Sequence, residues 1–171
     1  NASPFHAGKR AEREERMAER ARTLGVPLVY AHLVGGQDEV VFDGASFAVD
    51  AKGQVGARAP SFEVATLPVT LQPNGAVSGP LADPPSYEGE IWAALVCGVR
   101  DYLGKNGFPG AIIGLSGGID SALVLAIAVD ALGADKVRTV MMPSPYTADI
   151  SWIAANDMAD RLGVQRDEIS I

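Results

Sequence analysis

Apolar and polar positions follow different periods in the first and last parts of the chain. In the first part, residues 10–24 place apolar side chains at helical spacing, with arginine and glutamate on the opposite face. Short apolar runs separated by turn residues follow, and these predict a meander of strands. The expected elements are a strand at 28–34, a hairpin of 40–42 and 45–49 through Asp43–Gly44, a turn at Lys52–Gly53 and a strand at 62–67.

In the last part, helical and strand-like stretches alternate. Ser86 can cap a helix that stops at Lys105 and Gly107, a cation and a glycine. The elements expected after it are a strand at 111–115, helices at 120–132 and 149–162, and strands at 137–142 and 168–171. Strands that alternate with helices are typical of a parallel sheet with helices packed on its faces. The fold class is therefore α/β.

Residues 68–86 separate these two parts and have almost no periodic pattern. They hold five prolines of the chain's 11, together with Asn74–Gly75. Because proline removes a backbone donor and glycine favours turns, no regular element is expected here. We interpret the stretch as a linker between domains at 1–67 and 87–171, with a long surface loop as the alternative.

Composition and charge exclude several classes of protein. With 14 Lys and Arg against 21 Asp and Glu, the net charge of −7 argues against a nucleic-acid binder. The single cysteine, Cys97, excludes an internal disulfide and a cysteine-based zinc site. No apolar run approaches the ~20 residues of a membrane span. The chain starts at Asn1 without a methionine and stops inside a strand-like run, so we interpret it as cut at both ends.

The stretch from Ser116 to Ser121 carries the strongest chemical signal. A strand runs into Ser116-Gly117-Gly118 and then directly into a helix. Glycines let the backbone turn sharply and bring its N–H groups close to an anion, and the start of the helix adds further unpaired N–H groups. The two serine hydroxyls can donate as well. Together these groups predict a phosphate-sized anion site at the carboxyl end of a strand, where open α/β sheets bind ligands.

Asp120 distinguishes this loop from other phosphate loops. No lysine lies between Pro109 and Lys136, so the Walker pattern is absent, and GLSGGI does not match GxGxxG. A carboxylate that faces a polyphosphate repels it unless a cation lies between them. We therefore interpret Asp120 as a ligand of Mg²⁺, which prefers oxygen ligands shared with phosphate. The alternative is that Asp120 only caps the helix and that Ser-Gly-Gly is an ordinary turn.

Several stretches resemble known families. SGGIDS (116–121) resembles the pyrophosphate loop of the ATP pyrophosphatases, which activate a carboxyl or carbonyl group by adenylation. VMMPSPYTADIS (140–151) and the helix at 87–108 resemble NAD⁺ synthetases. Residues 1–14 and 29–46 are similar to the later part of the nitrilase-type glutaminase domain that precedes the synthetase domain in glutamine-dependent NAD⁺ synthetases. The two matches occur in the right order and cover nearly the whole chain.

The resemblance implies a fold and a reaction. The fold is the C-terminal part of a nitrilase-like α/β sandwich, then the start of a parallel-sheet, Rossmann-like domain of the adenine-nucleotide alpha-hydrolase type. The reaction joins ammonia from glutamine to nicotinic acid adenine dinucleotide, using ATP and Mg²⁺, through an adenylated intermediate, and releases NAD⁺, AMP and pyrophosphate. It also implies a cytoplasmic ligase, homo-oligomeric as a complete protein, with neither nucleic acid nor membrane as a partner.

The resemblance also implies roles for individual residues. Ser116, Gly117, Gly118 and Ser121 would hold the phosphates of ATP, with Asp120 on Mg²⁺, and Met141 and Met142 would hold adenine. Tyr146, Thr147 and Asp149 would border the dinucleotide, and Ser3 and Lys9 would bind glutamine. Alternatives stay open for some of these: core packing for the two methionines, helix capping for Thr147 and Asp149, and a solvated surface position for Lys9.

The catalytic Glu, Lys and Cys of the glutaminase would lie upstream, and Cys97 is expected to be a packed core residue. Further ATP and dinucleotide contacts, with another acidic Mg²⁺ ligand, would follow Ile171. The chain alone is therefore not expected to complete the reaction. His6 and His32 have no metal-type spacing and are expected to be structural. Two other functions stay open: another AMP-forming amidotransferase of the same loop type, and a non-catalytic nucleotide-binding module.

Overall fold

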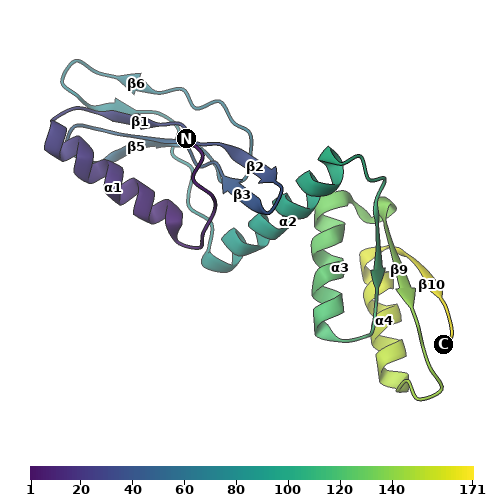
Figure 1. Cartoon of the computed structure of the whole chain (residues 1–171). Helices are drawn as coiled ribbons and strands as arrows, with labels where there is room; N and C mark the ends of the chain where they lie inside the picture. The colour runs from purple at the N-terminus through teal and green to yellow at the C-terminus, as the bar shows by residue number, and fades with distance from the viewer. The chain divides into compact units, whose positions relative to one another are not determined.

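The computed structural model describes every residue from Asn1 to Ile171, and its contacts divide them into two compact units (Figure 1). The first unit is Asn1–Gly98 and the second is Val99–Ile171. The first is built on an antiparallel sheet and the second on a parallel one. The division falls inside helix α2 (Tyr87–Lys105), so residues 68–86 group with the first unit.

The main sheet of the first unit is covered by helix α1 (Lys9–Leu24), whose bounds nearly match the predicted helix. Gly25 closes the helix with a left-handed φ of 68° and an N–H bond to the carbonyl of Ala21. The sheet has the order β1-β4-β5, with strands Leu28–Tyr30, Phe47–Val49 and Val55–Arg58. Ala21 packs against Phe47 and Val49, so the apolar stripe of α1 forms this core.

The predicted hairpin through Asp43–Gly44 is wrong. Strand β3 (Val40–Asp43) pairs with β2 (Val34–Gln37), whereas β4 pairs with β1 and β5. The predicted strand at 28–34 is accordingly split between β1 and β2. Asp43 is fully buried and ion-paired with Arg13, so the Asp-Gly step leads the chain from one sheet to another. The predicted turn at Lys52–Gly53 is confirmed, and it joins β4 to β5.

The predicted strand at 62–67 does not form either. Phe62 has a positive φ of 60° and packs with Ala94 and Cys97 of α2, which takes the backbone out of strand geometry. Val64 is 93% exposed and has no neighbouring strand. Cys97 is buried in this cluster, as expected.

Residues 68–86 are more ordered than their composition suggests. They contain a short antiparallel pair, β6 (Thr70–Leu71) and β7 (Val77–Ser78), which corrects the expectation that no regular element forms here. The N–H of Arg58 donates to the carbonyl of Pro80 at 2.8 Å, and the N–H of Ala82 donates to the carbonyl of Arg58 at 3.0 Å. These tertiary hydrogen bonds to β5 supply order that no local pattern could signal.

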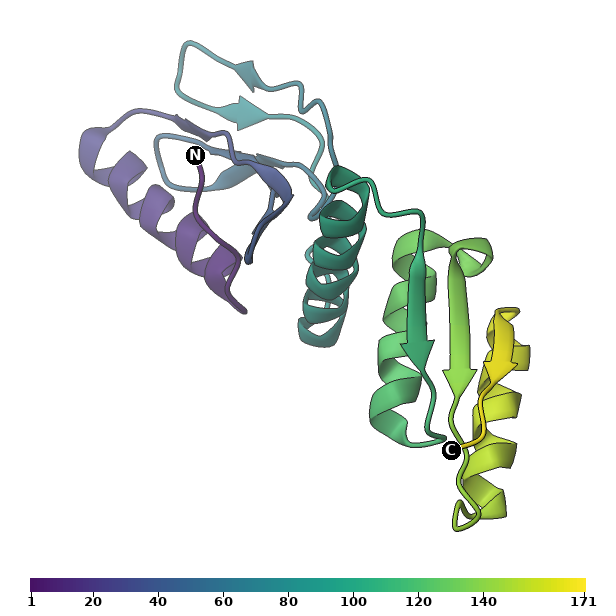
Figure 2. The same ribbon diagram turned by 45° about the vertical axis from the view of Figure 1, so that its right-hand side comes forward.

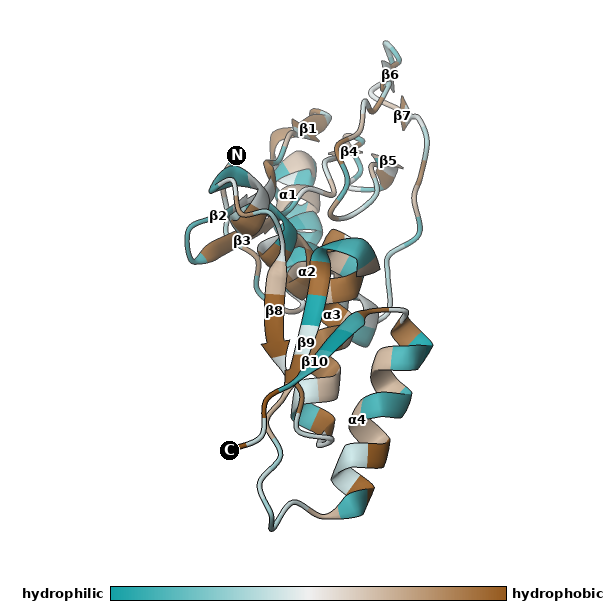
Figure 3. Ribbon diagram, turned by 90° about the vertical axis from the view of Figure 1, so that its right-hand side faces the viewer, coloured by the Kyte–Doolittle hydropathy of each residue, from teal (hydrophilic) through white to brown (hydrophobic).

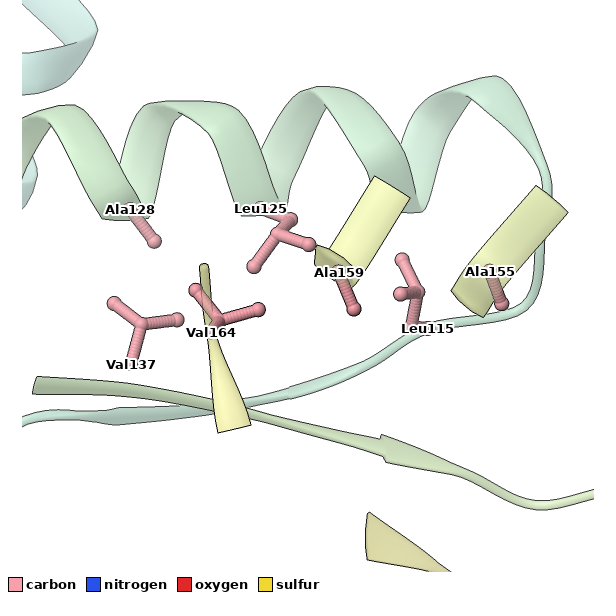
Figure 4. Packing of buried hydrophobic residues seen from close by; sticks show 7 residues of the cluster. All are labelled: Leu115, Leu125, Ala128, Val137, Ala155, Ala159 and Val164. Carbon is pink, nitrogen blue, oxygen red and sulfur yellow. The ribbon is translucent and has the colours of Figure 1, made fainter. Parts of the chain in front are cut away.

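The second unit has the predicted alternation of strands and helices around a parallel sheet of order β10-β9-β8. Its elements are β8 (Ala111–Gly114), α3 (Ile119–Leu132), the short helix η1 (Ala134–Lys136), β9 (Val137–Met141), α4 (Asp149–Leu162) and β10 (Gln165–Glu168). Figure 2 shows α3 and α4 on the same face of this sheet. Leu125 and Ala128 of α3 point toward Val137 and Val164, and this apolar cluster forms the core (Figure 4).

The last strand begins earlier than predicted, at Gln165 rather than at residue 168. Its four residues are all polar or charged and all exposed, and Figure 3 shows β10 as hydrophilic, in contrast to the hydrophobic β8. The strand pairs with β9 through backbone hydrogen bonds and an exposed ion pair between Asp167 and Arg138, so a search for apolar runs misses it. None of the helices combines the length and the apolar character that crossing a membrane demands.

Candidate functional site

The loop Ser116–Ser121 lies at the carboxyl end of β8 in the parallel sheet. Gly117 has a φ of +79°, and a Cβ atom placed on it would lie 2.1 Å from the carbonyl oxygen of Ser151 in α4. Only glycine fits such a position. Gly118, by contrast, has an extended φ of −87°, and the nearest atom to an added Cβ is the Ser116 hydroxyl at 3.4 Å. The backbone therefore requires the first glycine of the pair more than the second.

The two serine hydroxyls close the loop on itself. The Oγ atoms of Ser116 and Ser121 lie 3.0 Å apart, and the N–H of Ser116 donates to the Ser121 Oγ at 3.2 Å. The Ser121 hydroxyl also donates to the carbonyl of Gly118 at 3.0 Å, and the N–H of Gly118 donates to the Ser116 Oγ at 3.3 Å. These bonds hold the turn before any ligand binds, which is the preorganisation that an anion site requires.

Helix α3 begins at this loop without a side-chain cap. Its N-cap is Gly118, so the N–H groups of the first turn have neither an intrahelical partner nor a capping side chain. Asp120 lies in that first turn, is exposed, and makes no capping hydrogen bond, so the capping alternative is not supported. The uncapped N–H groups and the helix dipole favour an anion at this end.

Asp120 is the carboxylate that this loop offers to a cation. Nowhere in the chain do three His, Cys, Asp or Glu side chains gather as a metal site. Mg²⁺ is commonly held by one or two carboxylates together with substrate phosphates and waters. The residues present therefore fit a cation that arrives with a polyphosphate, and they do not form a closed protein site for a metal alone.

A cavity of about 260 Å³ joins the loop to the end of β9. Its lining residues are Gly114, Leu115, Ser116, Met141, Met142 and Thr147. Met142 is 53% exposed, whereas Met141 is half-buried and also packs against the apolar core. The structure thus brings the predicted adenine pair beside the predicted phosphate loop, and Met141 contacts both the core and the cavity.

The other residues of the 144–149 stretch lie differently. Thr147 closes a turn, since its Oγ1 accepts from the N–H of Ser144 at 2.8 Å. The N-cap of α4 is Ala148 and has no side-chain cap, so neither Thr147 nor Asp149 caps the helix. Tyr146 is 95% exposed and does not line the cavity.

The predicted glutamine residues are not brought together. The Lys9 ammonium pairs with the Glu12 carboxylate at 3.1 Å and lines a hollow of about 500 Å³ along α1. Ser3 is not among the residues that line this hollow. The backbone of Ser3 contacts the His32 ring instead.

Sequence reasoning missed a buried charged cluster in the first unit. Arg13 is ion-paired with Asp43, both are buried, and the His32 Nδ1 lies 3.8 Å from an Asp43 carboxylate oxygen. Burial and the nearby Arg13 charge lower the pKa of His32, and the Asp43 carboxylate offsets part of that shift. The three residues come from separate elements at irregular spacing, so no local motif signals them.

Fold and site together define an α/β protein with a glycine-containing turn between a parallel strand and an uncapped helix. Residues 91–171 match the family model described as NAD synthase. Over its whole length the chain is 47% identical to the glutamine-dependent NAD(+) synthetase of Xylella fastidiosa, across 175 residues, and covers 32% of that protein. The enzyme of the same name from Thermotoga maritima is 38% identical over 199 residues, covering 96% of this chain and 34% of the relative.

A solved structure gives the same result. The glutamine-dependent NAD⁺ synthetase from Acinetobacter baumannii, in complex with ADP, superposes with a TM-score of 0.96 at 42% identity, covering 100% of this chain and 33% of that one. The resemblance found in the sequence is therefore confirmed: the chain is a relative of the glutamine-dependent NAD⁺ synthetases from end to end. It spans about a third of the length of the curated relatives it matches.

Proposed function

We propose that this chain serves glutamine-dependent NAD⁺ synthesis, as part of a complete ligase that amidates nicotinic acid adenine dinucleotide at the expense of ATP. The observation that carries the proposal is the loop Ser116–Ser121. It sits at the carboxyl end of a parallel strand, before an uncapped helix, in a chain similar throughout to these synthetases. The alternatives are another AMP-forming amidotransferase and a non-catalytic nucleotide-binding module.

The loop suits the chemistry of the proposed reaction. A carboxylate is a poor acceptor for ammonia until one of its oxygens carries a good leaving group, which transfer of AMP provides. The N–H groups at the start of α3 and the hydroxyls of Ser116 and Ser121 would hold the pyrophosphate portion of ATP. Asp120 would bind Mg²⁺, which neutralises phosphate charge when bound.

The cavity next to the loop supports the proposed adenine site. Met141 and Met142 line it, and both can pack on a planar base. Thr147 lines the same cavity and would border the dinucleotide, with the exposed Tyr146 further along the same turn. In the first unit, Ser3 and Lys9 would belong to the glutamine side of a nitrilase-like sandwich. The complete protein would form a homo-oligomer.

The test is the use of MgATP by the complete protein and its variants. Asp120→Asn and Ser121→Ala should each lower kcat/KM for MgATP, by about 100-fold for Asp120→Asn. Asp130→Asn, an exposed aspartate near the other end of the same helix, serves as the matched control. If neither loop variant affects MgATP use, the loop performs no phosphate chemistry and the non-catalytic alternative holds. A product other than NAD⁺ would favour another amidotransferase.

A further inference from the structure

The His32 side chain is buried just beyond β1 and has no exposed surface. Its ring stacks on Tyr30, with centroids 5.6 Å apart, and meets Phe42 edge-on. The charged groups that face it are Asp43 and, behind that carboxylate, Arg13. A buried imidazole held on several sides presents its two nitrogens in fixed directions.

Each ring nitrogen meets a different part of the backbone. Nδ1 lies 3.1 Å from the carbonyl oxygen of Gly44. Nε2 lies 3.2 Å from the backbone nitrogen of Ser3 and 3.0 Å from its carbonyl oxygen. The carbonyls of Gly44 and Ser3 can only accept, so a proton on Nδ1 bonds Gly44 and leaves Nε2 to accept from the Ser3 N–H, whereas a proton on Nε2 bonds the Ser3 carbonyl. In either form Nε2 bonds the backbone of Ser3. The ring thus bridges the start of the chain to the step that follows β3.

The segment around Ser3 is fixed by backbone bonds on either side. The N–H of Leu33 donates to the carbonyl of Asn1 at 2.9 Å, and the N–H of Phe5 donates to the carbonyl of Val41. Between these two anchors, the peptide groups of Ser3 face His32. The direction in which the Ser3 side chain leaves the backbone therefore depends on the ring.

We propose that His32 is a positioning residue for the glutamine site: its Nε2 fixes the backbone of Ser3 and thereby sets the affinity for glutamine. The inference rests on the proposed function, in which Ser3 binds glutamine. His32 does not touch the substrate and takes no part in bond making. Loss of the bond between His32 and Ser3 raises the KM for glutamine and leaves the synthetase reaction with free ammonia unchanged.

Two amide substitutions separate the two ring nitrogens. The amide of glutamine reaches the place of Nε2, so His32→Gln can still bond the Ser3 backbone as donor or acceptor. The shorter asparagine reaches only the place of Nδ1, so His32→Asn keeps the bond to Gly44 and loses Ser3. His6→Gln is the matched control, because His6 is exposed and its ring contacts only the carbonyl of neighbouring Ala7.

The experiment measures NAD⁺ formation by the complete protein with glutamine and, in parallel, with ammonium chloride. We expect His32→Asn to raise the KM for glutamine about five-fold, the value of one hydrogen bond, and His32→Gln to stay near the unaltered protein. His6→Gln should change nothing, and all variants should match the unaltered protein with ammonia. Thermal denaturation of each variant shows whether it is folded.

Different outcomes would overturn the role of His32 and the proposed function. If His32→Asn and His32→Gln have the same KM for glutamine, whether raised or unchanged, Nε2 does not position Ser3 and the inference is overturned. It is equally overturned if ammonia-dependent activity falls in step with glutamine-dependent activity, which indicates general damage. If the unaltered protein makes NAD⁺ from neither glutamine nor ammonia, the proposed function itself has failed.

Discussion

In the first unit, ion pairs add to the apolar contacts that hold α1 to its surroundings, whereas α3 and α4 of the second unit pack through an apolar cluster. Arg13 of α1 is buried against Asp43, and Glu14 takes two hydrogen bonds from Arg58 of β5, at 2.7 and 2.9 Å. In the second unit, the buried cluster around Leu125 contains no charged side chain. The two units thus differ in what specifies the packing of their elements: buried charged pairs as well as apolar side chains in the first unit, and apolar side chains in the second.

The difference has a consequence for the two candidate sites. The candidate phosphate loop is made by consecutive residues on a strand-turn-helix, supported by an apolar core, so its geometry is local. The backbone of Ser3 is hydrogen-bonded to His32, 29 positions away, and His32 lies beside the ion pair of Arg13 and Asp43, which are 30 positions apart. The candidate glutamine site therefore depends on long-range polar contacts, which are costly to disturb once buried.

The largest effect is expected from breaking the buried ion pair. Arg13→Ala leaves the Asp43 carboxylate buried without its partner and should destabilise the first unit by about 3–5 kcal/mol. Hydrogen exchange of peptides from α1 and β4 measures this loss. Arg161→Ala, which removes an exposed i,i+4 pair with Asp157, is the control and should cost about 0.5 kcal/mol or less. Equal losses of stability in Arg13→Ala and Arg161→Ala would contradict the claim that the buried ion pair matters more than the exposed one.

An apolar truncation tests the other unit. Leu125 is fully buried, and Leu125→Ala should destabilise the second unit by about 3 kcal/mol through lost contacts and a cavity. Leu123→Ala on the same helix is the control, because Leu123 is 49% exposed and should cost about 1 kcal/mol or less. The loss of stability should speed hydrogen exchange in β9 and leave the hydrogen exchange of α1 unchanged. A loss shared equally by α1 would mean that the units do not unfold separately.

A smaller effect is expected in the phosphate loop. Gly117→Ala forces a side chain into a left-handed backbone and against the Ser151 carbonyl, for about 1–3 kcal/mol of strain. Gly118→Ala, where the backbone is extended and the nearest atom is 3.4 Å away, should cost less. Differential scanning calorimetry of the two variants compares them. If Gly118→Ala proves the more damaging, the account of this turn is wrong.

The smallest expected effect is on the pH dependence of stability, which should differ between the two units. Burial lowers the pKa of His32 from 6.5, so the unfolded chain binds this proton more readily than the folded one. The stability of the first unit should therefore be constant above about pH 6.5 and fall as the pH drops below it. Both histidines lie in the first unit, so the second has no such contribution. Unfolding measured between pH 5.5 and 8 should show this fall, and His32→Gln should remove it.

Features set by nearby residues could be predicted from the sequence. The alternation of strands and helices, the ends of α1 and α2, and the loop Ser116–Ser121 depend on local periodicity, caps and glycines. Features set by distant partners could not. Asp43–Gly44 has the composition of a hairpin turn, yet burial of Asp43 against Arg13 sends the chain elsewhere. Strand β10 is paired by its backbone although its side chains carry no apolar signal.

The same distinction applies to the candidate sites. Met141, Met142 and Thr147 were expected at the nucleotide site from the resemblance, and they lie near the loop because consecutive strands of a parallel sheet end at the same edge. The role of His32 was out of reach, since the sequence shows an isolated histidine and gives no sign that Ser3 and Gly44 lie on either side of its ring. Polar contacts between residues that are distant in the chain follow no fixed spacing in the sequence, so no sequence pattern predicts them.

The central claim is that this chain serves an ATP-driven amidation through its phosphate loop. The most direct measurement gives the complete protein glutamine, MgATP and nicotinic acid adenine dinucleotide, and quantifies every adenine-containing product. The account predicts NAD⁺ and AMP in equal amounts, with pyrophosphate released, and about 100-fold slower formation of all three in Asp120→Asn at low MgATP. Formation of ADP and phosphate in place of AMP and pyrophosphate, or the absence of NAD⁺, would contradict it.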